Sequence, residues 1–268
     1  MLKLIDTFSV IRDIIPYTNN ISRPKISGSL RNVFIAKSID GTFVCKFNHR
    51  DMAVKNSVIS ESMEKHGISA PKIRVYNHNH YWIEVYPIIP GKTLYEHIGN
   101  GLKNEAIQYL YHDIVDLFVK MNDIDVNILD KFPHKYTHQV AKTNISDVNN
   151  PVLGAVFSGA VQLMNRGAPE DVGIYHCGIT PKNVILDENG KFAALLDLDE
   201  VAVADINYAF AMMAGKYQKI GNNPMDLVDY YECRTGRKLN HKKIQKLANL
   251  TNVGKYLLWH NAKHNRGK

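Results

Sequence analysis

The feature that most constrains the fold of this sequence is a loop followed by a hairpin between His176 and Asp197. Asn183 stands seven residues after the histidine, and two short apolar runs follow it, separated by an Asn-Gly pair at 189–190. Asn-Gly between two such runs is a strong signal for a tight β-hairpin. The pattern therefore predicts that the hairpin brings Asn183 and Asp197 together.

The N-terminal part is predicted to be rich in strands, with one helix. Residues 31–38 and 42–48 are short β-branched runs joined by an Asp-Gly pair, which indicates a hairpin. Residues 51–66 are expected to form a helix capped by Asp51 and ended by the following glycine. Two more strands are expected at 72–76 and 81–89, which places a β-rich unit at residues 1–89.

The remainder, residues 90–268, is predicted to be mainly helical and to contain the hairpin described above. Helical spacing of apolar residues is found in the segments 94–98, 105–121, 152–165, 203–217 and 239–262. Residues 131–150 have weak periodicity and are interpreted as a loop or an insertion on the substrate side. A small β-rich lobe followed by a larger helical lobe is an α+β, bilobal arrangement typical of kinases.

Composition indicates a water-soluble globular protein. Hydrophobic residues make up 45% of the 268 residues and charged residues 22%, which are ordinary values. No apolar run approaches the ~20 residues that span a bilayer, so we expect no membrane partner. The N-terminus does not have the pattern of a signal peptide. Three widely spaced cysteines fit neither a disulfide framework nor a zinc site, and they favour a reducing, cytoplasmic location or delivery into a host cell.

The net charge of +7 is concentrated at the end of the chain. Residues 234–268 contain ten Lys or Arg residues and no Asp or Glu. This basic segment is compatible with a solvated surface, with a nucleic-acid patch, or with attraction of anionic substrates and nucleotide phosphates. No nucleic-acid motif accompanies the charge, so the solvated surface is favoured over a nucleic-acid partner.

The loop and hairpin have the layout of a phosphoryl-transfer centre, in which a catalytic loop precedes a hairpin that ends at a metal-binding Asp. Asn183 and Asp197 offer an amide oxygen and a carboxylate, which are oxygen ligands suited to Mg²⁺. The alternatives are a turn asparagine and an aspartate at the end of a strand. Asp199 adds a carboxylate that is either a second metal ligand or an exposed charge. His176 is expected to shape the loop and is given no catalytic role.

The N-terminal unit contains candidates for holding nucleotide phosphates. Lys46, on the second strand of the first hairpin, could reach the α- and β-phosphates, although it also fits a surface lysine. Glu61 or Glu64 on the following helix could orient it, Glu61 having the more usual separation, or the two could be solvated. Gly28 and Ser29 precede the first strand, where a glycine lets backbone N–H groups approach phosphates but is also common in hairpin turns.

Several motifs resemble the aminoglycoside phosphotransferase and choline kinase group of the protein-kinase-like fold. They are YHCGITPKNVILD at 175–187, LDLD at 196–199, VAD at 203–205 and the flanking segments 66–73 and 83–94. The resemblance spans about residues 27–211. It implies ATP and Mg²⁺ as cofactors, with Lys46 on the phosphates, Asn183 and Asp197 on the metal, and adenine bonded to the hinge backbone around Pro87 and Ile89.

One position departs from the family's pattern. The family has a proton-accepting Asp two residues after the histidine, and Gly178 stands there. Three explanations are open: a natural pseudokinase, an Asp replaced by design or by chance in a loop whose neighbours still fit it, or another group in its role, with Asp199 the nearest. A general base contributes about 10²–10⁴-fold, so its loss slows transfer without abolishing nucleotide binding.

The sequence thus predicts an ATP- and Mg²⁺-dependent phosphotransferase acting on a hydroxyl of a small molecule, impaired by the glycine at 178. One alternative is a nucleotide-binding pseudokinase that regulates a partner. Another is a kinase acting on protein hydroxyls, which the absence of evident Asp-Phe-Gly and Ala-Pro-Glu motifs disfavours. A basic nucleic-acid binder is the third.

Overall fold

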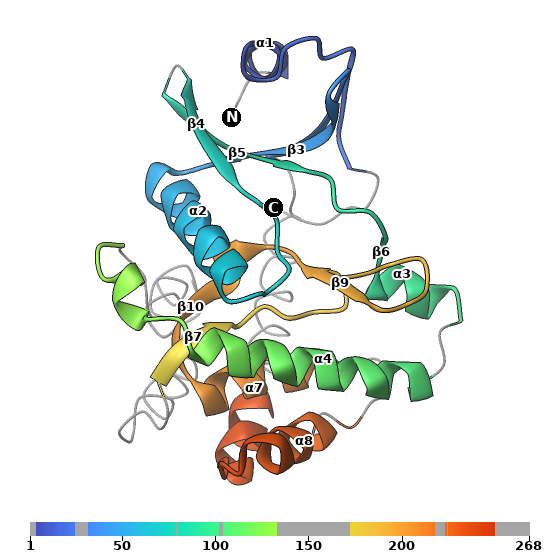
Figure 1. The fold of residues 1–268 in the computed structure, drawn as a ribbon, viewed down its shortest axis with the longest axis vertical. Helices are drawn as coiled ribbons and strands as arrows, with labels where there is room; N and C mark the ends of the chain where they lie inside the picture. The colour runs from blue at the N-terminus through green and yellow to red at the C-terminus, as the bar shows by residue number, and fades with distance from the viewer. Residues whose placement is uncertain are drawn as a thin grey trace, which may run out of the picture.

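The structure is a computed structural model that describes residues 4–24, 32–78, 80–101, 104–132, 172–217, 223 and 225–249. An N-terminal sheet with helices α1 (Leu4–Ile14) and α2 (Arg50–Lys65) lies above a mainly helical part that also contains short strands (Figure 1). The predicted phosphate loop at Gly28 and Ser29 and the predicted helix at 152–165 lie outside these residues. So do most of the 131–150 segment and the end of the basic segment.

The N-terminal sheet is antiparallel and has five strands in the order β1-β2-β3-β5-β4. The strands are β1 (Asn20–Ser22), β2 (Val33–Ser38), β3 (Gly41–Asn48), β4 (Arg74–His78) and β5 (Tyr81–Pro87). The predicted first hairpin is confirmed, because Ser38 pairs with Gly41 across a two-residue turn. Gly41 has φ +133°, a backbone angle that glycine adopts without strain.

A helix that the sequence analysis did not predict covers one face of this sheet. Helix α1 (Leu4–Ile14) lies at the outer side of the sheet in Figure 1. Its Val10 and Ile11 are buried against Phe34 and Phe47 of the sheet. The helix gives the sheet a hydrophobic core of its own, on the side away from the rest of the protein.

Helix α2 (Arg50–Lys65) connects the sheet to the larger core. Its N-cap is His49, with φ −74° and ψ 153°, so the predicted cap at Asp51 was wrong; that carboxylate lies in the first turn, where it favours the positive end of the helix. The helix ends as predicted, with Gly67 at φ +65°. Ile59 and Met63 are fully buried in the larger hydrophobic cluster, so α2 fixes the position of the sheet over the helical part.

The chain leaves the sheet through a short strand and two helices. Strand β6 (Lys92–Thr93) pairs with the later hairpin, and helix α3 (Leu94–Gly99) follows directly. Thr93 and Glu96 form a capping box that satisfies the first backbone N–H groups of α3. Helix α4 (Asn104–Asn122) and the 3-10 turn η1 (Val126–Leu129) come next, and α4 buries Ile114, Phe118 and Met121 in the larger core.

The predicted loop and hairpin are confirmed. Strand β8 (Val184–Leu186) pairs with β9 (Phe192–Leu195) on one side and with β6 on the other. Strand β7 (Val172–His176) pairs with β10 (Val201–Asp205). The 3-10 turn η2 (Leu198–Glu200) lies between β9 and β10. Helices α7 (Ile206–Tyr217) and α8 (Met225–Thr235) follow, and residues 241–249 are helical.

One helix boundary was wrong. The predicted helix at 203–217 begins at Ile206, because the preceding residues form strand β10 against β7. Pairing with a distant strand overrides local helical periodicity there. None of the described helices is long and apolar enough to cross a membrane. The division of the chain at residue 89 stays a prediction.

Candidate functional site

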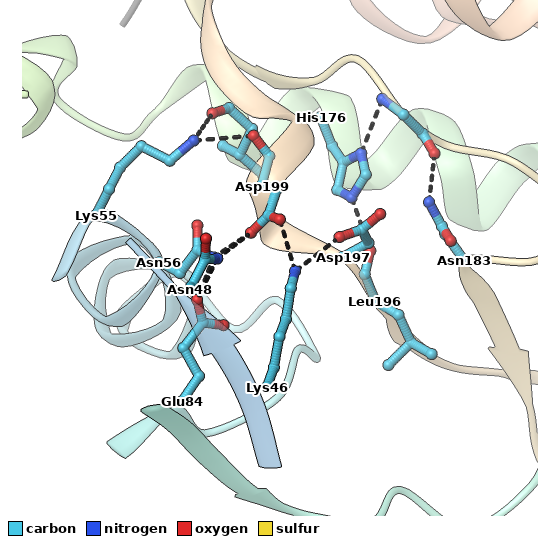
Figure 2. Close-up of polar contacts among 12 residues, drawn as sticks. Lys46, Asn48, Lys55, Asn56, Glu84, His176, Asn183, Leu196, Asp197 and Asp199 are labelled. Atoms are coloured by element: carbon cyan, nitrogen blue, oxygen red, sulfur yellow. Dashed lines mark hydrogen bonds and ion pairs between the residues drawn. The ribbon is translucent and has the colours of Figure 1, made fainter. Parts of the chain in front are cut away.

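Lys46 is the centre of a charged cluster that joins the two parts of the molecule. Its Nζ lies 3.1 Å from Asp197 Oδ1 and 2.7 Å from Asp199 Oδ2, and its side chain is only 15% exposed (Figure 2). Burial alone would lower the pKa of Lys46, but the carboxylates of Asp197, Asp199 and Glu84 outweigh burial and raise it. Lys46 is therefore a protonated amine that forms ion pairs with two carboxylates.

The side chain of Asp199 is held by protein groups on both oxygens. Lys46 occupies Oδ2, while Oδ1 accepts hydrogen bonds from Asn48 Nδ2 at 3.3 Å and from Asn56 Nδ2 at 2.5 Å. Burial alone would raise the pKa of Asp199, but the charge and hydrogen bond of Lys46 outweigh it and lower it. Asp199 thus ties the turn after β9 to strand β3 and to helix α2.

Glu84 lies beneath this cluster and is almost completely buried. It is paired with Lys46 across strands β3 and β5, and its Oε1 accepts hydrogen bonds of 2.9 Å from both Asn48 and Asn56. Burial raises the pKa of Glu84 to about 7. A carboxyl group that is only partly ionised near neutral pH therefore forms the floor of the site.

The structure does not bring Glu61 or Glu64 to Lys46. Glu61 is 69% exposed and pairs with Lys65 at 2.8 Å, while Glu64 pairs with Lys72. The residue of α2 that faces the cluster is Asn56, because the inward face of the helix is set by its buried packing against the core. In place of the predicted glutamate, α2 supplies Asn56, whose amide binds Asp199, and Asp199 in turn pairs with Lys46.

Lys55 is a second buried lysine in this region, and the sequence analysis missed it. Its Nζ donates to the backbone carbonyls of Asp199 at 2.9 Å and of Val201 at 3.1 Å. Burial lowers the pKa of Lys55, against the attraction of Asp199 and Glu200. Lys55 therefore anchors the turn η2 at its middle residue, Asp199, and at Val201, the residue directly after it. The available sequence signal was a run of polar residues at 55–57, because the buried face of α2 passes through this run.

His176 organises the loop before the hairpin. Its Nδ1 accepts a hydrogen bond of 3.0 Å from the N–H of Gly178, which leaves Nε2 to carry the hydrogen and donate to the Leu196 carbonyl at 2.8 Å. The imidazole is fully buried. This geometry supports the structural role predicted for His176, because the ring connects the loop to the end of β9.

Asn183 and Asp197 lie next to each other at the end of the hairpin, with a 2.7 Å bond from the Leu196 N–H to the Asn183 carbonyl. Asn183 Nδ2 donates to the Gly178 carbonyl at 2.9 Å, which leaves its Oδ1 as an acceptor. Asp197 has φ +64° and ψ +62°, a left-handed conformation that few non-glycine residues adopt. Its side chain is 42% exposed, against 30% for Asp199.

These two oxygen donors fit a magnesium ion. In the described ranges no group of three or more His, Cys, Asp or Glu side chains is arranged to hold a metal by itself. Mg²⁺ commonly binds through one or two carboxylates and completes its shell with substrate phosphates and water. The donor set of Asp197 and Asn183 therefore suits a metal that arrives together with a phosphate.

The segment after β5 contains a backbone N–H that has no partner among the described residues. Pro87 is exposed at the end of the strand, and the N–H of Ile88 donates to the Thr42 carbonyl at 2.9 Å. For Ile89 no hydrogen bond of the backbone N–H is found with any residue in the described part of the chain. The hinge contacts expected at Pro87 and Ile89 stay a prediction, for which the Ile89 N–H is an available donor.

The glycine at 178 is in contact with a side chain that the sequence analysis did not consider. A Cβ at Gly178 would lie 2.5 Å from Glu200 Cγ and 2.6 Å from Glu200 Cβ. Atoms near the backbone cannot move away by rotation of a chain end, so an Asp at 178 requires Glu200 and its turn to shift. The explanation that the neighbours of 178 still fit an Asp is therefore not supported by the packing.

Comparisons with known proteins give one family match and a set of similar folds. The sequence model of the phosphotransferase enzyme family matches residues 25–232. No curated protein matches the sequence.

Three solved structures illustrate the likeness. Choline kinase LicA from Streptococcus pneumoniae is 15% identical with a TM-score of 0.69, covering 98% of this chain and 92% of that one. Aminoglycoside phosphotransferase APH(3'')-Id from Streptomyces rimosus, in complex with ADP and streptomycin, is 13% identical with a TM-score of 0.68, covering 95% and 99%. The GDP and kanamycin complex of APH(2'')-IIIa is 10% identical with a TM-score of 0.71, covering 97% and 93%. The predicted α+β, protein-kinase-like fold is confirmed.

Proposed function

Because the chain belongs to the phosphotransferase enzyme family, we propose that it transfers the γ-phosphoryl group of ATP to a hydroxyl of a small molecule. The observation that carries this proposal is the ion pair of Lys46 with Asp197, 151 residues later in the chain, at the end of the hairpin. Phosphoryl transfer depends on positioned charges more than on covalent chemistry, and this pair joins a phosphate-binding charge to a metal-binding one.

Each part of the nucleotide has a candidate partner. Lys46 would bind the α- and β-phosphates, the backbone N–H of Ile89 and carbonyl of Pro87 would bond the base, and the backbone at Gly28 and Ser29 would cover the phosphates. ADP and GDP occur in complexes of the structurally similar aminoglycoside phosphotransferases. GTP is therefore a donor to be tested beside ATP.

Asn183 Oδ1 and the Asp197 carboxylate would hold Mg²⁺, which when bound neutralises charge on the phosphates. The left-handed backbone of Asp197 directs its carboxylate toward Lys46, and the bond between the Leu196 N–H and the Asn183 carbonyl keeps the two ligands adjacent. Asp199 is better explained as a positioning residue than as a second ligand, because Lys46, Asn48 and Asn56 already occupy its oxygens.

The acceptor class follows from the same likenesses. The similar structures include a choline kinase and complexes with streptomycin and kanamycin. We take a small hydroxylated molecule as the acceptor. Choline, streptomycin and kanamycin are the first compounds to test.

Calorimetry of MgATP and MgGTP binding, with transfer of labelled γ-phosphate to the three acceptors, tests the proposal. Wild type should bind nucleotide, and Lys46→Ala and Asp197→Asn should weaken binding at least tenfold. Lys37→Ala is the matched control, since Lys37 is exposed on the neighbouring strand β2. Absence of nucleotide binding in wild type would contradict the proposal. Binding without any transfer would instead favour the pseudokinase reading that Gly178 suggests.

A further inference from the structure

A carboxylate that accepts a hydrogen bond from the acceptor hydroxyl speeds phosphoryl transfer by about 10²–10⁴-fold, and the carboxylates around Lys46 are mostly occupied. Asp197 is paired with Lys46, and both oxygens of Asp199 have protein partners. Glu84 is 1% exposed and bonded to two amides. Oδ2 of Asp197 is left over, but the proposed function assigns that carboxylate to Mg²⁺, so these three groups are not available to an incoming hydroxyl.

Glu200 is the exception. It is exposed, and no hydrogen bond or ion pair of its carboxylate is found within the part of the chain that the structure describes. It follows Asp197 by three residues, at the end of the turn η2. The Glu200 N–H donates to the Asp197 carbonyl at 3.3 Å, so Glu200 is bonded to a candidate metal ligand and its own carboxylate oxygens are available.

Its direction is given by the contact with Gly178. A Cβ on that glycine would lie 2.5 Å from Glu200 Cγ and 3.2 Å from Glu200 Cδ. The side chain of Glu200 thus occupies the space that a side chain at 178 would fill, and its carboxyl carbon lies at the edge of that space. A short acidic side chain at 178 would direct its carboxylate into the same region of the loop.

The turn that carries Glu200 is held by two groups through three hydrogen bonds. The Glu200 carbonyl accepts a 3.0 Å hydrogen bond from the N–H of Cys177, in the loop that contains Asn183. Lys55 binds the carbonyls of the residues on either side, Asp199 and Val201. The backbone of Glu200 is therefore fixed against the loop while its carboxylate stays open to solvent.

We propose that Glu200 is the catalytic carboxylate of this chain and takes the place left empty by Gly178; the inference rests on the proposed function. The acceptor hydroxyl oxygen forms a bond to Pγ, the bond between Pγ and the β,γ-bridging oxygen breaks, and the nucleoside diphosphate leaves with that electron pair. The hydroxyl proton passes to a Glu200 oxygen. The glycine at 178 is then required by packing, because any side chain there collides with Glu200.

The first test compares Glu200→Gln with wild type in nucleotide binding and in transfer of labelled γ-phosphate to choline, kanamycin, streptomycin and water. Loss of a general base predicts a fall of about 10²–10⁴-fold in kcat, with the MgATP Kd unchanged. Glu188→Gln is the matched control, because Glu188 is an exposed glutamate at the tip of the β8–β9 hairpin. Thermal unfolding followed by circular dichroism verifies that both variants fold.

A second test moves the carboxylate from one position to the other. Glu200→Gly should be as slow as Glu200→Gln, and Gly178→Asp alone should lose stability through the collision. Gly178→Asp combined with Glu200→Gly removes the collision and should be faster than Glu200→Gly alone. A double variant that folds and binds ATP, but transfers phosphate no faster than Glu200→Gly, contradicts the proposal that the two positions supply the same carboxylate.

Failure of this inference can be told apart from failure of the proposed function. If wild type transfers phosphate and Glu200→Gln does so at the full rate, Glu200 is not the catalytic carboxylate and the phosphotransferase assignment stands. If wild type binds MgATP but transfers to none of the acceptors, Glu200 does not supply the base and nucleotide binding stands. If wild type binds neither MgATP nor MgGTP, both proposals fail together.

Discussion

Glu84 allows a quantitative prediction, because burial raises its pKa from the ordinary 4.5 to about 7. The folded protein then holds a proton more tightly than the unfolded chain. The stability contributed by the neutral carboxyl is fully present below pH 4.5 and is lost as the pH rises through 7. At about 1.4 kcal/mol per pKa unit, the loss amounts to roughly 3 kcal/mol at pH 8.

Glu84→Gln should remove this pH dependence. Glutamine keeps the size of the side chain and an oxygen that accepts from Asn48 and Asn56, but it does not ionise. The variant should therefore lie within about 1 kcal/mol of wild type at pH 5 and exceed it in free energy of unfolding by up to about 3 kcal/mol at pH 8.

Urea denaturation at half-unit steps from pH 5 to pH 8.5 measures this difference. The midpoint of wild type should fall relative to the variant as the pH rises, with equal m-values. Glu188→Gln, at an exposed position, is the control and should follow wild type throughout. A Glu84→Gln protein that is less stable than wild type at pH 8 would refute the reasoning. It would show that attraction to Lys46 outweighs the cost of burying the charge.

Three further predictions concern the supports of the site. Lys55→Met leaves two buried carbonyls without their donor and should cost about 1–3 kcal/mol in urea denaturation, with slower phosphate transfer because η2 is released; unchanged stability would contradict the anchoring role. Thr93→Ala breaks the capping box of α3 and should cost about 1 kcal/mol, which Thr93→Ser should largely restore. Iodoacetamide should label exposed Cys233 in the native protein. Buried Cys45, whose pKa burial raises to about 12, should react only after unfolding, as peptide mapping would show.

Short-range patterns could be read correctly from the sequence. Asp-Gly and Asn-Gly turns between apolar runs predicted the two hairpins, because turn geometry depends on the turn residues themselves. The adjacency of Asn183 and Asp197 follows from the second hairpin alone. The end of α2 at Gly67 is equally local, since a left-handed residue there needs no distant contact.

The tertiary structure decided what depends on packing between distant segments. The rotation of α2 brings Asn56 rather than Glu61 to the cluster, and this is set by which side chains the core buries. Strand β10 forms instead of the start of a helix because β7 pairs with it. The fold of a loop and a turn places the Glu200 side chain in the space beside Gly178, 22 positions earlier in the chain.

The sequence by itself therefore determined the fold family, the two metal-binding candidates and the absence of an acidic residue at 178. It could not show what fills the space beside that glycine, because local propensities carry no information about which side chain a neighbouring turn delivers there. Only the packing of η2 against the loop, held by Lys55 and by the Cys177 N–H, places a glutamate at that point.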